Sequence, residues 1–441
     1  IRTSGEYDGV IDFDAAQRDP ENPDNFRPEY DSGDNLHPSD AGYEAMANAI
    51  DLAVLKGRGP GVDRVTAAAS KGCSTPSWVV SWAAAQQLNP TSSGFENQTV
   101  RNIVRTTVGG SRVRVRLSNT FGKQALTLNH VTVALRDQGA GLVPDSVREL
   151  TFSQQTDVTI PPGARALSDP VALDVPAGAD LAVSLFVLAP TVPTTGHFYA
   201  LKTNYVSTPT GDHTSETGAG PFVQTTTSWA FVEAVDVLAP QTTFAIVPLG
   251  DSITDGQGST VDSNTRWPDF TARRLLARGL AGQMGVTDHG IAGNKVMSDT
   301  PATGASAARR LDRDVLAQTG VTDVIFLEGI NDLNGGTTAE QLIDATQQIV
   351  ARVHARRLRI HGGVLTPNGA NPERDKFNEW IRTSAVFDSV IDFDAAVRDP
   401  ESPDNWQPGT DSGDNLHGSD AGYELMGNAV DLSAFRGAPC Y

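Results

Sequence analysis

FAIVPLGDSIT, residues 244–254, is the stretch that decides the fold of this chain. Its apolar beginning breaks at Gly250, Asp251 and Ser252. An apolar run followed by a break of this kind predicts a buried strand that leads into a tight turn with a serine at its tip. Because the strand fixes the position and the turn lifts the hydroxyl out of the sheet, Ser252 is a candidate nucleophile.

Downstream of this stretch, apolar runs alternate with segments of helical spacing. We expect strands at 286–289, 322–327, 359–365 and 390–393, and helices at 268–278, 305–317, 339–356 and 419–432. Strands that alternate with helices predict a parallel sheet covered on both faces, hence an α/β fold. Since ligands bind beyond the carboxyl ends of such strands, the chemistry is expected directly after each strand.

Residues from about 78 to 237 have a different texture. Apolar and polar residues alternate in VRVRLSN (113–119), LTLNHVTVAL (126–135) and LAVSLFVLA (181–189), and turn clusters separate these runs. This pattern predicts an all-β sandwich. We expect it to pack over the following domain or to build a lid there, with carbohydrate or surface binding as the alternative. Its histidines are expected at the surface, namely His130, His197 and His213.

The chain also contains an internal repeat. Residues 1–52 align with residues 381–432 without gaps, and most positions are identical. Each copy predicts a helix end, a strand (10–13 or 390–393), a long loop and a helix capped by Ser39 or Ser419. Because one strand and one helix cannot bury a core, we expect the chain to be a piece of a longer tandem protein. In the alternative, the first copy docks on this chain or swaps between molecules.

These observations divide the chain into four parts. We expect a partial repeat at 1–55, a Gly/Pro-rich linker at 56–70, the β-sandwich at 71–240 and the α/β domain at 241–441. The two cysteines, Cys73 and Cys440, would join the β-sandwich to the C-terminus if they form a disulfide, and two free buried thiols are the alternative. Their separation does not match a zinc site.

The charge of the chain excludes some partners. A net charge of −19 and a pI near 4.7 argue against binding to nucleic acid or to an anionic membrane, because phosphates would be repelled. No apolar run approaches the roughly 20 residues that a membrane-spanning helix needs.

Four short motifs follow the expected strands or precede the last helix. They are Gly-Asp-Ser (250–252), Gly-Ile-Ala-Gly-Asn (290–294), Gly-Ile-Asn-Asp (329–332) and Asp-Asn-Leu-His (414–417). A serine, an imidazole and a carboxylate suit a nucleophile, its general base and the group that orients the base. A glycine N–H and an asparagine amide suit the stabilisation of an oxyanion.

In order and spacing, these motifs resemble the four blocks of the SGNH (GDSL) hydrolase superfamily. RWPDF (266–270) and residues 310–314 are similar to a bacterial, secreted branch with a β-domain before the hydrolase domain. The resemblance implies a three-layer, flavodoxin-like domain with a parallel sheet, and a secreted protein without metal or cofactor.

The resemblance also assigns roles to residues. It implies that Ser252 is the nucleophile, His417 the general base and Asp414 the carboxylate that orients the base. The oxyanion hole would be formed by Ser252, Gly293 and Asn331. Two neighbouring residues are interpreted as structural: Asp332 as a hydrogen-bonding residue that holds its loop, and Gly290 as a turn residue.

The repeat duplicates half of this set, because Asp34 and His37 correspond to Asp414 and His417. We expect the C-terminal pair to serve Ser252, since it follows the strand order of its own domain. If the first copy occupied that place, the C-terminal copy would be displaced in a swapped arrangement.

The resulting hypothesis is a secreted serine esterase that acts on a small-molecule or polysaccharide ester. The lack of a long apolar lid helix and the aromatic content of 7% favour short acyl chains. The enzymatic alternatives are a polysaccharide acetylesterase, which an aromatic-lined patch on the β-sandwich would favour, and a lipase. In the non-enzymatic alternative, the chain is a binding protein with a relic hydrolase domain.

Overall fold

The computed structural model describes residues 11–50, 76–89, 92–191, 194–208, 210–240, 242–279, 284–300 and 304–435. These residues belong to two compact units, the first before residue 71 and the second from residue 71 onward. The expected linker at 56–70, Cys73 and Cys440 lie outside the described residues.

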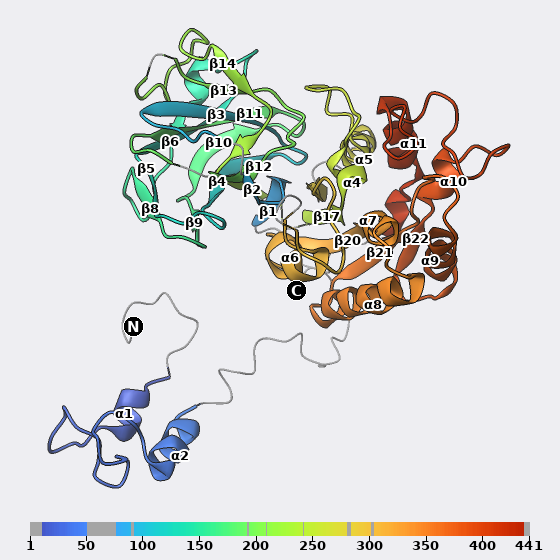
Figure 1. Cartoon of the computed structure of the whole chain (residues 1–441). Coiled ribbons are helices and arrows are strands. Elements are labelled where there is room, and N and C mark those ends of the chain that lie inside the picture. Colours follow the sequence, from blue (N-terminus) through green and yellow to red (C-terminus); the bar gives the residue numbers. More distant parts are fainter. Residues whose placement is uncertain are drawn as a thin grey trace, which may run out of the picture. The chain divides into compact units, whose positions relative to one another are not determined.

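Residues 76–240 form antiparallel sheets, as the alternation predicts (Figure 1). One sheet has the order β1 (Ser77–Ala83), β16 (Val232–Ala239), β4 (Gly110–Ser118), β10 (Val171–Val175), with β9 (Arg165–Leu167) also on β4. The second has the order β14 (Gln224–Thr226), β13 (Asn204–Val206), β3 (Gln98–Arg105), β11 (Asp180–Val187), β6 (His130–Leu135), β7 (Arg148–Glu149). A smaller sheet has the order β15 (Trp229–Ala230), β12 (Thr194–His197), β2 (Gln87–Asn89), and β5 (Leu126–Leu128) pairs with β8 (Val158–Ile160).

Strand β4 shows why this sequence forms a sandwich. Val113, Val115 and Leu117 are fully buried in the core of this region. The arginines between them lie on the opposite face, where Arg114 donates to Asp236 of β16 at 2.9 Å. Alternate side chains of β4 therefore face the apolar core, and the side chains between them form ion pairs with the neighbouring strand.

Residues 244–435 form a parallel sheet with helices on both sides. The strand order is β18 (Met284–Val286), β17 (Phe244–Gly250), β20 (Val321–Leu327), β21 (Arg359–Gly363), β22 (Ser389–Ile391), and β19 (His289–Gly290) also pairs with β17. The helical elements are α4 (Ser252–Asp255), α5 (Trp267–Ala277), α6 (Ala307–Leu311), the π-helical turn η2 (Asp312–Leu316), α7 (Ile330–Asn334), α8 (Ala339–Ala355), α9 (Pro372–Thr383), α10 (Phe393–Val397), α11 (Asp420–Ala429) and η3 (Leu432–Ala434). Figure 1 shows α5 and α11 on one side of the sheet and α6 and α8 on the other.

The predicted fold class, a three-layer α/β domain preceded by antiparallel β-sheets, is thus confirmed. Some boundaries differ from the expectation. The expected strand at 286–289 is split into β18 and β19, and the strand expected to reach Phe393 ends at Ile391. Asp392 ends it because its carboxylate accepts the N–H of Ala395 at 2.9 Å and so caps the short helix α10.

The first unit has the helices α1 (Phe13–Gln17) and α2 (Asp40–Asn48), the second capped by Ser39 as predicted. The prediction of a strand at 10–13 was wrong for the described residues of this range, since Phe13 begins the helix α1. In the C-terminal copy the corresponding strand, β22, forms by pairing with β21. The counterpart of β22 is residues 9–11, of which 9 and 10 lie outside the described residues. Asp12 accepts the N–H of Ala15 at 2.9 Å and caps α1, just as Asp392 caps α10.

Within the second unit, the β-sheets pack closely on the α/β domain. Ala245 of β17 lies in the core of the β-sandwich, and the N–H of Val80 in β1 donates to the carbonyl of Thr319 at 2.9 Å. The Thr319 hydroxyl in turn donates to the buried Asp236 at 2.8 Å. The two regions therefore share apolar and buried polar contacts. In the described ranges, no helix combines the length and apolar character that crossing a bilayer requires.

Candidate active site

Ser252 lies where the sequence predicts it, at the carboxyl end of β17. Every residue of β17 is buried, and Ser252 is the first residue of α4 rather than the tip of an open turn. Asp251 caps this helix by accepting the N–H of Ile253 at 3.0 Å. Burial raises the pKa of Asp251 to about 7. Ser252 itself is 4% exposed.

His417 brings Ser252 and Asp414 together. Its Nε2 lies 2.8 Å from the Ser252 Oγ, and its Nδ1 lies 2.6 Å from Oδ2 of Asp414. Since the carboxylate accepts the Nδ1 proton, Nε2 is left with a free lone pair that faces the serine hydroxyl. This is the arrangement needed for removing a proton from Ser252.

A single loop turn suffices to join Asp414 and His417. Oδ1 of Asp414 accepts the backbone N–H groups of Leu416 and His417 at 3.0 and 2.9 Å, so the loop folds back onto the carboxylate. Partial burial opposes ionisation, but these hydrogen bonds and the His417 ring outweigh it and lower the pKa of Asp414 to about 2. The carboxylate therefore stays charged at neutral pH.

The glycine block forms a tight turn beside this end of the sheet. The N–H of Asn294 donates to the carbonyl of Ile291 at 3.0 Å, and Gly293 has φ +74°. A turn with this φ at its third residue is type II, which favours glycine there. Among the described residues no acceptor is found for the Gly293 N–H. The turn is connected to β17, because the N–H of Ile291 donates to the carbonyl of Gly250 at 3.1 Å.

Asn331 forms a hydrogen bond with the same turn from the end of a neighbouring strand. It lies in α7, directly after β20, and its Nδ2 donates to the carbonyl of Asn294 at 2.9 Å. One of its two amide hydrogens thereby fixes the side chain. Asp332 holds the following loop by accepting the N–H groups of Val296 and Met297 at 2.8 and 3.2 Å. Its interpretation as a structural residue is confirmed.

Arg310, which is fully buried, connects the end of β17 with β19 and the glycine turn through hydrogen bonds. Its guanidinium donates to the carbonyls of Gly250 and His289 at 2.9 and 2.7 Å and to the Asn294 side chain at 3.0 Å. Its Nη2 also lies 3.5 Å from Glu328. The sequence placed Arg310 only in a stretch similar to a family branch, because nothing local shows that its five donors turn inward.

Two interpretations from the sequence were wrong. His197 is not at the surface: it is 2% exposed, and its Nε2 lies 2.9 Å from Oδ1 of Asp255 in α4. Gly290 is not a turn residue but the end of β19, where a Cβ would lie 2.1 Å from the backbone nitrogen of Asp255. Close packing of α4, rather than a turn, requires glycine at this position.

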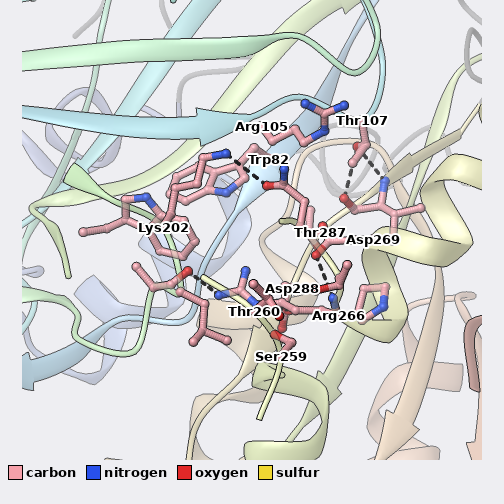
Figure 2. A pocket seen from close by; sticks show the side chains of 17 residues that line it. Trp82, Arg105, Thr107, Lys202, Ser259, Thr260, Arg266, Asp269, Thr287 and Asp288 are labelled. Atoms are coloured by element: carbon pink, nitrogen blue, oxygen red, sulfur yellow. Dashed lines mark hydrogen bonds and ion pairs between the residues drawn. The ribbon is translucent and has the colours of Figure 1, made fainter. Parts of the chain in front are cut away.

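Figure 2 shows a pocket between the two regions of the second unit. It has a volume of about 40 Å³, and the labelled residues from the β-sandwich are Trp82, Arg105, Thr107 and Lys202, while those from the α/β domain are Ser259, Thr260, Arg266, Asp269, Thr287 and Asp288. Neither Ser252 nor His417 is among the residues that line it. The pocket is therefore a feature of the interface and not of the serine site.

In the first unit, Asp34 and His37 repeat the local geometry of Asp414 and His417. The His37 Nδ1 lies 2.7 Å from Oδ2 of Asp34, but the imidazole is 66% exposed. The pairing of aspartate and histidine is thus a property of the loop alone, whereas of these two histidines only His417 has a described contact with a serine.

Comparisons with known proteins agree with the sequence motifs. Residues 249–425 match the model of the GDSL-like lipase/acylhydrolase family, and residues 2–50 match a second model described as GDSL-like lipase/acylhydrolase. No curated protein sequence matches the chain.

Several solved structures are similar to part of the chain. An acetyl xylan esterase, AlAXEase, is 19% identical, with a TM-score of 0.35 and 42% of this chain and 97% of that chain covered. A member of the lipolytic protein G-D-S-L family from Veillonella parvula is 16% identical, with a TM-score of 0.32 and coverage of 42% and 96%. LAE5, an alpha/beta hydrolase enzyme from the metagenome of Lake Arreo, is 20% identical, with a TM-score of 0.33 and coverage of 43% and 94%.

The motifs, the parallel sheet and the family match of residues 249–425 converge on one assignment. The C-terminal region of this chain is a domain of the GDSL/SGNH lipase and acylhydrolase family, preceded by a β-rich region.

Proposed function

We propose that this chain is a serine esterase that hydrolyses carboxylic esters through an acyl-enzyme, and that short-chain acyl esters are its preferred substrates. The observation that carries the proposal is the continuous contact from Asp414 through His417 to the Ser252 hydroxyl, at 2.6 and 2.8 Å. Nucleophile, base and orienting carboxylate lie within hydrogen-bonding distance before any substrate is bound.

In the first step, the Ser252 Oγ attacks the ester carbonyl carbon while its proton passes to Nε2 of His417. The carbonyl oxygen gains the negative charge of the tetrahedral intermediate. The intermediate then collapses, the alcohol leaves with the proton from His417, and the acyl group stays on Ser252. Water repeats the sequence with His417 as base, which releases the acid and restores the serine.

The N–H groups of Ser252 and Gly293 and the Nδ2 of Asn331 are the proposed oxyanion donors. As the first residue of α4, Ser252 has an N–H without an intrahelical acceptor. The Gly293 N–H has no described acceptor, and Asn331 keeps one amide hydrogen beyond its bond to Asn294. Removing one such donor costs about 100- to 1,000-fold in kcat.

The preference for short acyl chains is supported by the burial of the site. Ser252 and His417 are 4% and 6% exposed, which leaves little open surface at the nucleophile for a long chain. Large exposed apolar side chains in the described β-sandwich are aliphatic, namely Val143, Leu167, Leu188 and Val223. The exposed aromatic patch that would favour a polysaccharide acetylesterase is thus not found among them.

The test is hydrolysis of a p-nitrophenyl ester series from acetate to palmitate by the full chain, with Ser252→Ala as the control. We expect activity that falls steeply beyond short acyl chains and vanishes in the variant. Activity that rises with chain length would support the lipase alternative, and faster release of acetate from acetylated xylan than from p-nitrophenyl acetate would support the acetylesterase. Activity that survives in Ser252→Ala would overturn the assignment of the nucleophile.

A further inference from the structure

His197 is a residue of the β-sandwich that reaches a helix of the α/β domain. It ends β12, and its Nε2 lies 2.9 Å from Oδ1 of Asp255, the last residue of α4. Both side chains are 2% exposed. This buried contact joins the two regions directly at the helix that begins with Ser252.

The surroundings of His197 define its protonation. Its Nδ1 lies 2.9 Å from the carbonyl oxygen of Ala85, which only accepts, so Nδ1 carries a hydrogen. Its Nε2 faces a carboxylate and therefore donates as well. Burial alone would lower the pKa of His197, but the charge and hydrogen bond of Asp255 outweigh it and raise the pKa, against a smaller opposing effect of Arg266. The Ala85 carbonyl and the Asp255 side chain thus hold the two ring nitrogens of His197 from opposite sides.

The second oxygen of Asp255 holds the glycine turn. Oδ2 accepts the backbone N–H of Ala292 at 3.0 Å. Ala292 is the second residue of the type II turn, and Gly293, a proposed oxyanion donor, is the third. Asp255 thus connects the helix of the nucleophile with the turn of the oxyanion donor, and His197 fixes the orientation of its carboxylate.

We propose that His197 is a positioning residue for ester hydrolysis: through Asp255 and Ala292 it holds the Gly293 N–H in line with Ser252, so that the β-sandwich completes the active site. This inference rests on the proposed function. It assigns the β-sandwich a part in the reaction that does not require it to bind substrate. The Gly293 N–H stabilises mainly the negative charge that develops on the carbonyl oxygen during the reaction. The contribution of His197 therefore affects kcat more than KM.

The experiment measures kcat and KM of the full chain for p-nitrophenyl acetate in wild type, Ser252→Ala, His197→Ala, His197→Gln and His130→Ala. A glutamine amide can reach the position of Nε2 and donate to Asp255. His130 is the matched control, because it also pairs with carboxylates of the β-sandwich, Asp212 at 2.7 Å and Glu149 at 3.3 Å. Inhibition by a methyl trifluoromethyl ketone is measured in parallel, since its adduct with serine carries an oxyanion.

We expect His197→Ala to lower kcat by about 10- to 100-fold, as for a misplaced catalytic group, with KM within about threefold of wild type. The inhibition constant for the ketone should rise by a similar factor as kcat falls. His197→Gln should recover most of the loss, and His130→Ala should behave as wild type.

A His197→Ala variant with wild-type kcat would overturn the inference while leaving the proposed esterase intact. A loss that glutamine does not recover and that leaves ketone inhibition unchanged would also overturn it, because the residue would then only stabilise the fold. If His197→Ala does not fold, the Asp255→Asn variant provides the test, since the amide of asparagine cannot accept the N–H groups of both His197 and Ala292. An unchanged kcat in Asp255→Asn contradicts the inference. Wild-type protein without Ser252-dependent hydrolysis would overturn the proposed function and this inference together.

Discussion

At the scale of single residues, the site depends on groups whose charge is set by burial. Arg310 is surrounded by carboxyl groups that respond to it differently. The pKa of Asp314 is lowered to about 2, since the charges of Arg313 and Arg310 outweigh the effect of burial. Burial raises the pKa of Glu328 to about 8, although its Oε2 lies 3.5 Å from Arg310. Beside the same arginine, Asp314 is therefore charged, because Arg313 also donates to it, and Glu328 is neutral.

The duplicated histidines lead to a first prediction. His417→Ala should lower kcat by about 10,000-fold or more, because Ser252 loses the general base that we propose for it, while His37→Ala should retain wild-type activity. The measurement is p-nitrophenyl acetate hydrolysis by the two single variants of the full chain. Loss of activity in His37→Ala with retention in His417→Ala would show that the first copy serves the serine.

Glu328 leads to a second prediction, on stability. Between pH 4.5 and about 8, the unfolded chain releases the Glu328 proton and the folded chain keeps it. The free energy of unfolding contributed by this group therefore falls as the pH rises, by at most about 1.4 kcal/mol per pH unit. Glu328→Gln cannot titrate, so its stability relative to wild type should increase from pH 5 to pH 8.

Urea unfolding at several pH values between 5 and 8 measures this difference. Glu379→Gln, which changes an exposed glutamate in α9, is the control and should follow wild type. If the stability difference between Glu328→Gln and wild type is constant over this range, Glu328 is already ionised in the folded protein.

At the scale of elements, the packing of α11 on α5 distinguishes the two copies of the repeat. Tyr423 and Met426 of α11 are fully buried, and Gly427 allows close contact with α5. A Cβ at Gly427 would lie 2.5 Å from the Cβ of Phe270 and 3.0 Å from the carbonyl oxygen of Trp267. The first copy has Ala47 at this position, so it does not fit this α5 without a shift of the helix.

Gly427→Ala should therefore lower the free energy of unfolding of the second unit by about 1–3 kcal/mol, as is typical of overpacking. Thermal unfolding followed by circular dichroism measures the change. Asn428→Ala, on the exposed face of the same helix, should leave the stability within about 0.5 kcal/mol. A Gly427→Ala variant as stable as wild type would mean that α5 moves aside easily and that the first copy also fits.

At the scale of the whole molecule, the β-sandwich and the α/β domain share one interface within the second unit. Arg116 of β4 donates to the side chains of Gln318 and Thr319, both at 3.2 Å. Thr319 donates to Asp236, and His197 binds Asp255. Buried polar groups at this interface would lose their partners if one region unfolded alone, at about 1–3 kcal/mol for each unsatisfied group.

We therefore expect the second unit to unfold in one cooperative transition. Differential scanning calorimetry of the full chain should give a single transition for this unit, in which the calorimetric and van't Hoff enthalpies agree. Arg116→Ala should lower the temperature of this transition without splitting it. Two separate transitions for the sheets and the α/β domain would contradict the expectation.

The sequence by itself determined the features that depend on neighbouring residues. The apolar run before Ser252, the spacing of the four motifs and the capping serines Ser39 and Ser419 are local, and they predict the parallel sheet, the site and the helix starts. The pairing of Asp414 with His417 is also local, since the first copy forms the same pair in a separate unit.

Only the tertiary structure decided which groups face each other across the chain. His197 and Arg310 resemble surface residues in their strand and helix, and their burial depends on which element covers them. Strand β22 likewise depends on β21, from which α9 separates it in the sequence, because a strand needs a neighbour to take its hydrogen bonds. The contact between His417 and Ser252 joins residues 165 positions apart, and packing of α11 on α5 brings them together.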